Sequence, residues 1–149
     1  MNQLHGHYLE DIETGMSAVY SKTITDADIL LFSGVSGDTN PLHLDHDFAA
    51  GTVFKSRIAH GMLSASLLST IFGTKLPGPG CIYMSQNLRF KAPVRSGDTV
   101  LARATVTEIL LDKRRVHFAC LCTVGQTAVI EGEAVIQVPR RPAVRAAAE

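Results

Sequence analysis

The sequence lacks an excess of charge of either sign. Fourteen lysine and arginine residues balance fourteen aspartate and glutamate residues in a chain of 149, and no long run of like charge offsets this balance locally. Proteins that bind nucleic acid or an anionic lipid surface through electrostatics usually carry such a basic region. The composition therefore argues against nucleic acid and membranes as partners.

Cysteine is scarce, and its spacing does not fit the usual metal or redox motifs. Cys81, Cys120 and Cys122 are odd in number, lack C-x-x-C spacing and lie in apolar, strand-like sequence. These features favour buried, reduced thiols over disulfide bonds or a zinc site.

The beginning of the chain has no apolar run. Its first fifteen residues, MNQLHGHYLEDIETG, are polar and mixed in charge, unlike a signal peptide or an arginine-rich transit peptide. We therefore expect a cytoplasmic location. The first twenty residues carry no recognisable motif, and His5 and His7 are expected to lie on a solvated tail.

The length predicts one domain with a sizeable core, because 149 residues are too few for two comfortable domains. No internal repeat interrupts the chain. We expect the fold to end near Pro139 and residues 140–149, RRPAVRAAAE, to form a flexible tail.

Two helices are predicted in the first half of the chain. Thr25 can cap a helix that begins at Asp26, and Gly34, Gly37 and Pro41 break the helical pattern that follows. Residues 58–74, IAHGMLSASLLSTIFGT, have almost no charge and predict a helix buried on nearly every side. Seventeen residues that include serine and threonine are too short and too polar for a typical membrane span.

Four apolar segments in the second half are typical of long strands joined by short turns: CIYMSQNLRF, DTVLARATVTEILL, RVHFACLCTV and TAVIEGEAVIQV. Short connections leave no room for crossover helices, so consecutive strands are expected to pair antiparallel. The predicted fold class is α+β, a curved antiparallel sheet wrapped around the central buried helix.

The loop after the first helix, SGDTNPLH, combines an acid and a base. Its glycines permit tight turns and Pro41 stiffens the loop, which can hold Asp38 and His43 at a fixed separation for acid–base chemistry. Alternatively, Asp38 caps a turn and His43 is a partly buried surface residue.

The stretch HLDHD offers a metal as a further alternative. His43, Asp45, His46 and Asp47 are all ligand types, although no distant cluster completes the site and Asp45 can instead cap a short HDFAA helix. We expect no metal and no cofactor.

His60 and Gly61 open the buried helix, where free amide groups and the positive end of the helix dipole can stabilise a developing negative charge. Alternatively, Gly61 only permits close packing and His60 is an ordinary residue at the start of a helix.

The run FSGVSGDTNPLH, followed after five residues by Ala49, resembles the signature of the MaoC-like (R)-specific enoyl-CoA hydratases, also called hydratase 2. The resemblance extends through IAHGMLSASLLSTIFG and GCIYMSQNLRFKAPVRSGD. It implies the hot-dog fold, a homodimer, and a cofactor-free lyase that adds water reversibly and syn to a trans-2-enoyl-CoA to give an (R)-3-hydroxyacyl-CoA.

The resemblance also assigns roles to residues. It makes Asp38 and His43 the catalytic pair, with the Gly61 N–H against the thioester oxygen. Asn40 belongs to the substrate-binding set and is expected to hold the loop more than to touch the substrate. Ser69 and Phe72 would face the acyl tunnel, where a bulky Phe72 favours short to medium chains; core packing is the alternative for both.

Arg57 stands where relatives of the family often have proline. Together with Lys91 and Arg95, it is a candidate for contacts to the CoA phosphates.

Other functions of the same fold stay open at this point. The substrate can instead be an acyl-carrier-protein thioester, as in a fatty-acid dehydratase. Thioester hydrolysis is a different reaction class, against which the DTNPLH loop argues. A non-catalytic acyl-CoA-binding protein would bind its ligand without Asp38 and His43.

Overall fold

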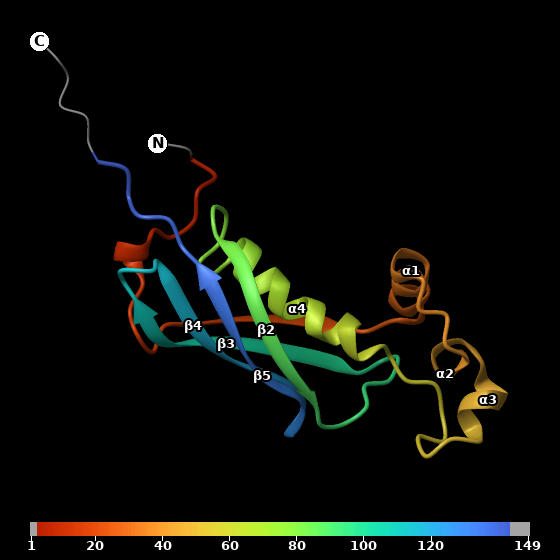
Figure 1. The fold of residues 1–149 in the computed structure, drawn as a ribbon. Helices are drawn as coiled ribbons and strands as arrows, with labels where there is room; N and C mark the ends of the chain where they lie inside the picture. Colours follow the sequence, from red (N-terminus) through yellow and green to blue (C-terminus); the bar gives the residue numbers. More distant parts are fainter. Residues whose placement is uncertain (1–2, 144–149) are drawn as a thin grey trace, which may run out of the picture.

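The computed structural model describes residues 3–143 of the chain. A short 3-10 helix precedes a five-stranded sheet and four α-helices, and Figure 1 shows the sheet bending around the longest helix, α4. In chain order the elements are η1 (Leu9–Asp11), β1 (Ser17–Thr23), α1 (Asp26–Ser36), α2 (Pro41–Leu44), α3 (His46–Ala50), α4 (Gly61–Thr74), β2 (Ile82–Phe90), β3 (Thr99–Leu110), β4 (Arg115–Val124) and β5 (Thr127–Gln137). This is the α+β hot-dog arrangement that the sequence predicts.

The strand order differs from the predicted one. All pairs are antiparallel, in the order β1-β3-β4-β5-β2. The expectation that consecutive strands pair is confirmed for β3 with β4 and for β4 with β5, and is wrong for β2 with β3. The connection between these two strands, residues 91–98, leaves the sheet and is held by a hydrogen bond of 2.7 Å from the Ala59 N–H to the Val94 carbonyl. It carries the chain from β2 at one edge to β3 near the other.

The sequence pattern does not predict β1, which forms the other edge of the sheet. Its side chains are exposed or half-buried along its whole length, so no clear alternation marks it. Cross-strand contacts hold it on β3, where Ser17 lies opposite Thr105 and Thr23 opposite Thr99. An edge strand stabilised by pairing with a distant segment leaves little local signal.

The expectation of a solvated tail at His5 and His7 is wrong. His7 Nδ1 lies 3.1 Å from the Pro77 carbonyl oxygen, and the His5 ring stacks on Tyr8 at 4.1 Å. Leu9, which follows, is fully buried and belongs to the hydrophobic core. The apolar residues at positions 8, 9 and 12 bring this segment down onto the body of the protein.

The predicted tail of residues 140–149 falls mainly outside the described residues. Within the described part, Arg140 and Arg141 are exposed and make contacts with the chain. Arg140 donates a hydrogen bond to the Leu111 carbonyl, and Arg141 forms an ion pair with Asp11.

Helix α4 packs against β1, β3 and β4. It begins at Gly61, three residues later than the apolar pattern indicates, because His60 has an extended backbone. The prediction of burial on nearly every side holds except at the last residue, Thr74, and along one stripe, where the exposed residues recur at helical spacing: Met62, Ser66, Ser69 and Gly73. Within residues 3–143, no helix has the length and apolar character to cross a membrane.

The three cysteines are free thiols, as predicted, and Cys120 and Cys122 are buried in β4. Burial raises the pKa of Cys120 to about 11 and that of Cys122 to about 12, and it also raises the pKa of the half-buried Cys81. Only the thiolate is nucleophilic. Near pH 8, the thiols of Cys120 and Cys122 should therefore react about a hundredfold or more slowly than a free cysteine.

Labelling of the native protein with a thiol reagent at pH 8, followed by mass spectrometry, tests this prediction. Cys81 should react first, and all three thiols should react after unfolding. Rapid labelling of Cys120 or Cys122 in the native protein would contradict it.

Candidate functional site

Helices α1, α2 and α3 lie together beyond one end of the sheet, beside the start of α4 (Figure 1). A capping box fixes the start of α1, because Thr25 accepts a hydrogen bond from the Asp28 N–H and Asp28 accepts one from the Thr25 N–H. The latter hydrogen bond, followed by the contact with Lys22, lowers the pKa of Asp28. Gly37 ends α1 with a φ of 78°, in the left-handed region that favours glycine. The chain therefore reverses immediately before Asp38.

Asn40 holds the next turn in place. Its side chain accepts a hydrogen bond of 3.0 Å from the Leu42 N–H, and Pro41 occupies the first position of α2. The prediction that His43 lies on a loop is wrong, because Asn40 caps a one-turn helix that contains His43. Asn40 is exposed and does not line the cavity described below.

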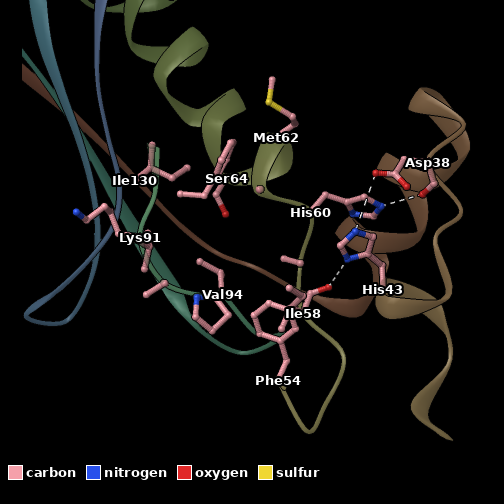
Figure 2. A pocket seen from close by; sticks show the side chains of 16 residues that line it. Asp38, His43, Phe54, Ile58, His60, Met62, Ser64, Lys91, Val94 and Ile130 are labelled. Atoms are coloured by element: carbon pink, nitrogen blue, oxygen red, sulfur yellow. Dashed lines mark hydrogen bonds and ion pairs between the residues drawn. The ribbon is translucent and has the colours of Figure 1, made fainter. Parts of the chain in front are cut away.

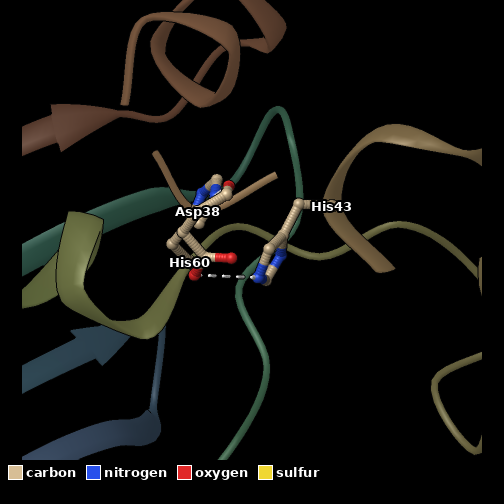
Figure 3. A group of neighbouring side chains, drawn as sticks. All are labelled: Asp38, His43 and His60. Atoms are coloured by element: carbon tan, nitrogen blue, oxygen red, sulfur yellow. Dashed lines mark hydrogen bonds and ion pairs between the residues drawn. The ribbon is translucent and has the colours of Figure 1, made fainter. Parts of the chain in front are cut away.

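Asp38 and His43 face each other, as Figure 3 shows. The distance from Asp38 Oδ2 to His43 Nε2 is 4.0 Å, too long for a direct hydrogen bond. His43 Nδ1 lies 2.8 Å from the Ile58 carbonyl oxygen, which can only accept a hydrogen bond. A neutral His43 ring therefore carries its proton on Nδ1, and the lone pair of Nε2 points toward Asp38.

The two side chains differ in their access to solvent. The His43 side chain is 9% exposed, and the Asp38 side chain is 52% exposed. A separation of 4.0 Å suits two groups that share one water molecule, each within hydrogen-bonding distance of it. The two side chains can therefore contact one small molecule at the same time.

His60 joins this pair, a contact that the sequence pattern did not predict. Its ring is 2% exposed and lies 3.8 Å from the His43 ring. Its Nε2 lies 2.9 Å from the Asp38 carbonyl oxygen and 3.2 Å from Ser33 Oγ. His60 thus contacts both members of the pair, and α1 through Ser33. Its position beside Gly61 was the only available signal.

The metal alternative based on HLDHD is not supported. Within residues 3–143, the residues that bring possible ligand atoms within 4.8 Å of one another are Asp38, His43 and His60. Asp45 instead caps α3, where it accepts a hydrogen bond from the Phe48 N–H, as the alternative interpretation of this residue predicts. If a metal ion did bind, these three residues would hold it, with one ligand atom from each.

A cavity of about 410 Å³ opens beside the pair (Figure 2). Its volume is in the range of small-molecule sites. One wall is the first turn of α4, and the opposite wall is formed by the connection after β2 and by β5. The lining residues are Asp38, His43, Phe54, Ile58, Ala59, His60, Gly61, Met62, Ser64, Phe90, Lys91, Ala92, Pro93, Val94, Val129 and Ile130.

Gly61 lies where this cavity meets the N-terminus of α4. The first amide groups of a helix have no partner within the helix, so they are available to a bound oxygen atom. A Cβ atom added to Gly61 would lie 2.5 Å from the Phe90 ring, so glycine allows Phe90 to approach the helix closely. The contact of the Gly61 N–H with a thioester oxygen stays a prediction.

Ser69 and Phe72 do not line this cavity. Ser69 lies on the exposed stripe of α4. Phe72 is buried and makes edge contacts with the rings of Phe118 at 4.9 Å and Tyr83 at 5.1 Å. These contacts are the core packing that was the alternative for Phe72, and substrate contact stays a prediction for both residues.

The three candidate basic residues differ in their contacts. Arg95 donates hydrogen bonds to Ser56 and to the Phe54 carbonyl, and Arg57 forms an ion pair with Asp26 and donates to the His43 carbonyl. Lys91 lines the cavity and lies 3.8 Å from Glu131, with its side chain half exposed. The two arginines thus hold loops around the site, and Lys91 is the best placed to reach a ligand.

The family model described as "MaoC like domain" matches residues 9–132. This range covers most of the chain and includes the site. The chain therefore belongs to the MaoC-like family, as the sequence signature indicates.

Its relatives within this family include enzymes. The (R)-specific enoyl-CoA hydratase of Rhodospirillum rubrum is 58% identical over 135 residues, which cover 91% of this chain and 94% of that protein. The 3-hydroxybutyryl-CoA dehydratase of Methylorubrum extorquens is 46% identical over 134 residues, or 90% of this chain and 85% of that protein. The unliganded R-hydratase PhaJ1 of Pseudomonas aeruginosa has a similar structure, with a TM-score of 0.85 and 44% identity over 91% of this chain and 88% of that chain.

Proposed function

We propose that this protein is a hydro-lyase, an (R)-specific enoyl-CoA hydratase that acts on short to medium trans-2-enoyl-CoA thioesters. The observation that carries the proposal is the placement of Asp38 and His43, 4.0 Å apart, beside a largely apolar cavity at the start of α4. The names of the relatives in Rhodospirillum rubrum and Methylorubrum extorquens support the choice of reaction.

The proposed chemistry follows from the orientation of the two side chains. A water molecule between them can give a proton to His43 Nε2 as its oxygen atom attacks C3 of the enoyl group. His43 then delivers that proton to C2 on the same face, which gives syn addition and returns His43 to its starting protonation state. The Gly61 N–H would stabilise the negative charge that builds up on the thioester oxygen.

Hydration of crotonyl-CoA, with chiral analysis of the product, tests the proposal. We expect (R)-3-hydroxybutyryl-CoA. Absence of hydration, or an (S) product, would contradict it. Turnover of matched CoA and acyl-carrier-protein thioesters separates the hydratase from a fatty-acid dehydratase, and release of free thiol would indicate a thioesterase.

We further propose a cytoplasmic homodimer. The edge strand β2 supports the dimer, because it exposes large apolar side chains beside backbone groups that a second copy can pair: Ile82, Tyr83, Met84 and Phe90. Sedimentation equilibrium should give twice the mass of the chain, and a monomer at micromolar concentration would contradict this.

His60 should affect the rate through the position of its neighbours. His60→Phe keeps a ring against His43 and loses the donor to the Asp38 carbonyl, so we expect about a tenfold loss in kcat with a smaller change in KM. His60→Gln, which retains an N–H donor, should recover part of the loss. Equal activity of His60→Phe and the wild type would show that the Asp38 loop is held without this hydrogen bond.

A further inference from the structure

Ser64 differs in its hydrogen bonding from Ser66 and Thr74, two other hydroxyl-bearing residues of α4. Ser66 and Thr74 donate hydrogen bonds of 2.6 Å to carbonyl groups of the helix itself. Ser64 is 1% exposed, and its Oγ has no hydrogen-bond partner within the described residues. Figure 2 shows its side chain on the cavity side of α4.

The surroundings of this hydroxyl are apolar. Most of the cavity that Ser64 lines is formed by hydrophobic side chains, among them Val94, Val129 and Ile130. A buried hydroxyl without a partner is costly, and a water molecule or a polar ligand atom relieves that cost. A methylene group placed against it cannot do so.

Ser64 also lies at a defined distance along the helix from Gly61. The two residues are three positions apart, so they lie on the same face of α4, about one turn from each other. If the thioester oxygen binds at the Gly61 N–H, an acyl chain that extends into the cavity passes close to Ser64.

We propose that Ser64 determines chain-length specificity by disfavouring apolar acyl carbons against its hydroxyl. With a four-carbon enoyl group, the cavity beyond the acyl chain admits a water molecule to which the Ser64 hydroxyl can turn, whereas a longer chain fills that space and leaves the hydroxyl unpaired. The inference rests on the proposed function. The role proposed for Ser64 differs from those of Ser69 and Phe72, because Ser64 lines the cavity and they do not.

The test compares kcat/KM for crotonyl-CoA and trans-2-hexenoyl-CoA in the wild type and in Ser64→Ala. We expect the hexenoyl-to-crotonyl ratio to rise about five- to tenfold in Ser64→Ala. Ser64→Cys keeps a similar volume with a weakly hydrogen-bonding group, and should shift the ratio in the same direction. Ser66→Ala, the matched control on the exposed stripe, should leave it unchanged.

Binding measurements keep this inference separate from the proposed function. Calorimetric titration with the saturated butyryl-CoA and hexanoyl-CoA requires no turnover, and Ser64→Ala should favour hexanoyl-CoA relative to the wild type. A protein that lacks hydratase activity would reject the proposed function, and the binding ratio would still decide the role of Ser64. If the enzyme is active, a hexenoyl-to-crotonyl ratio of kcat/KM in Ser64→Ala within twofold of the wild type would overturn the inference. If it is inactive, a hexanoyl-to-butyryl ratio of affinities within twofold of the wild type would do so.

Discussion

Asp38→Asn and His43→Ala should each lower kcat for crotonyl-CoA hydration by about a hundredfold to ten-thousandfold. Asparagine keeps the shape of Asp38 and loses the carboxylate, and alanine removes the Nε2 lone pair that faces it. Because the two groups act on one water molecule, the double variant should be little worse than the more damaging single variant. Steady-state kinetics with purified, folded variants measure both effects.

A second carboxylate–histidine pair in the same chain supplies the control. Glu108 Oε2 and His117 Nδ1 are 3.5 Å apart, and neither residue lines the cavity beside Asp38. Glu108→Gln and His117→Ala should therefore retain nearly full activity. Full activity of Asp38→Asn or His43→Ala would remove the basis of the proposed reaction.

Phe72→Ala should lower the free energy of unfolding by about 3–5 kcal/mol. The side chain is 1% exposed and packs between Phe118 and Tyr83, so its removal leaves an unfilled space in the core. Urea denaturation of the wild type and the variant, followed by circular dichroism, gives the difference.

Phe48→Ala is the matched control, since the same substitution is made at a side chain that is 52% exposed. It should change stability by no more than about 0.5 kcal/mol. The alternative role of Phe72 in the acyl tunnel makes a different prediction. Under that role, Phe72→Leu would change the preference among acyl chain lengths and would leave stability almost unaltered.

Local patterns in the sequence predicted much of the fold. Thr25 and Gly37 mark the two ends of α1 because a cap and a left-handed residue act over a few neighbouring positions. The same is true of the four apolar segments that become β2 to β5, and of the buried thiols in β4. The spacing of Asp38 and His43 also identified the pair that the structure brings together.

The features that the sequence did not predict depend on distant contacts. β1 is defined by its pairing with β3, and the position of β2 is defined by its pairing with β5. The place of His60 depends on Ser33 and the Asp38 carbonyl, more than twenty residues earlier in the chain. No local window of sequence contains both partners of such contacts.

The strand order has a consequence for how the chain reaches this structure during translation. β1 can pair with β3 only after Thr105, the partner of Ser17, has been synthesised. β2 can pair with β5 only after Gln137, the partner of Ile82, has been synthesised. Pairings between such distant segments slow folding, because closing a long loop costs conformational entropy before the stabilising contacts form. A nascent chain therefore carries β1 unpaired until β3 has been synthesised, and β2 unpaired until β5 has been synthesised. During that interval the apolar side chains of β2 lie beside unpaired backbone groups, a combination that favours aggregation and that chaperones shield.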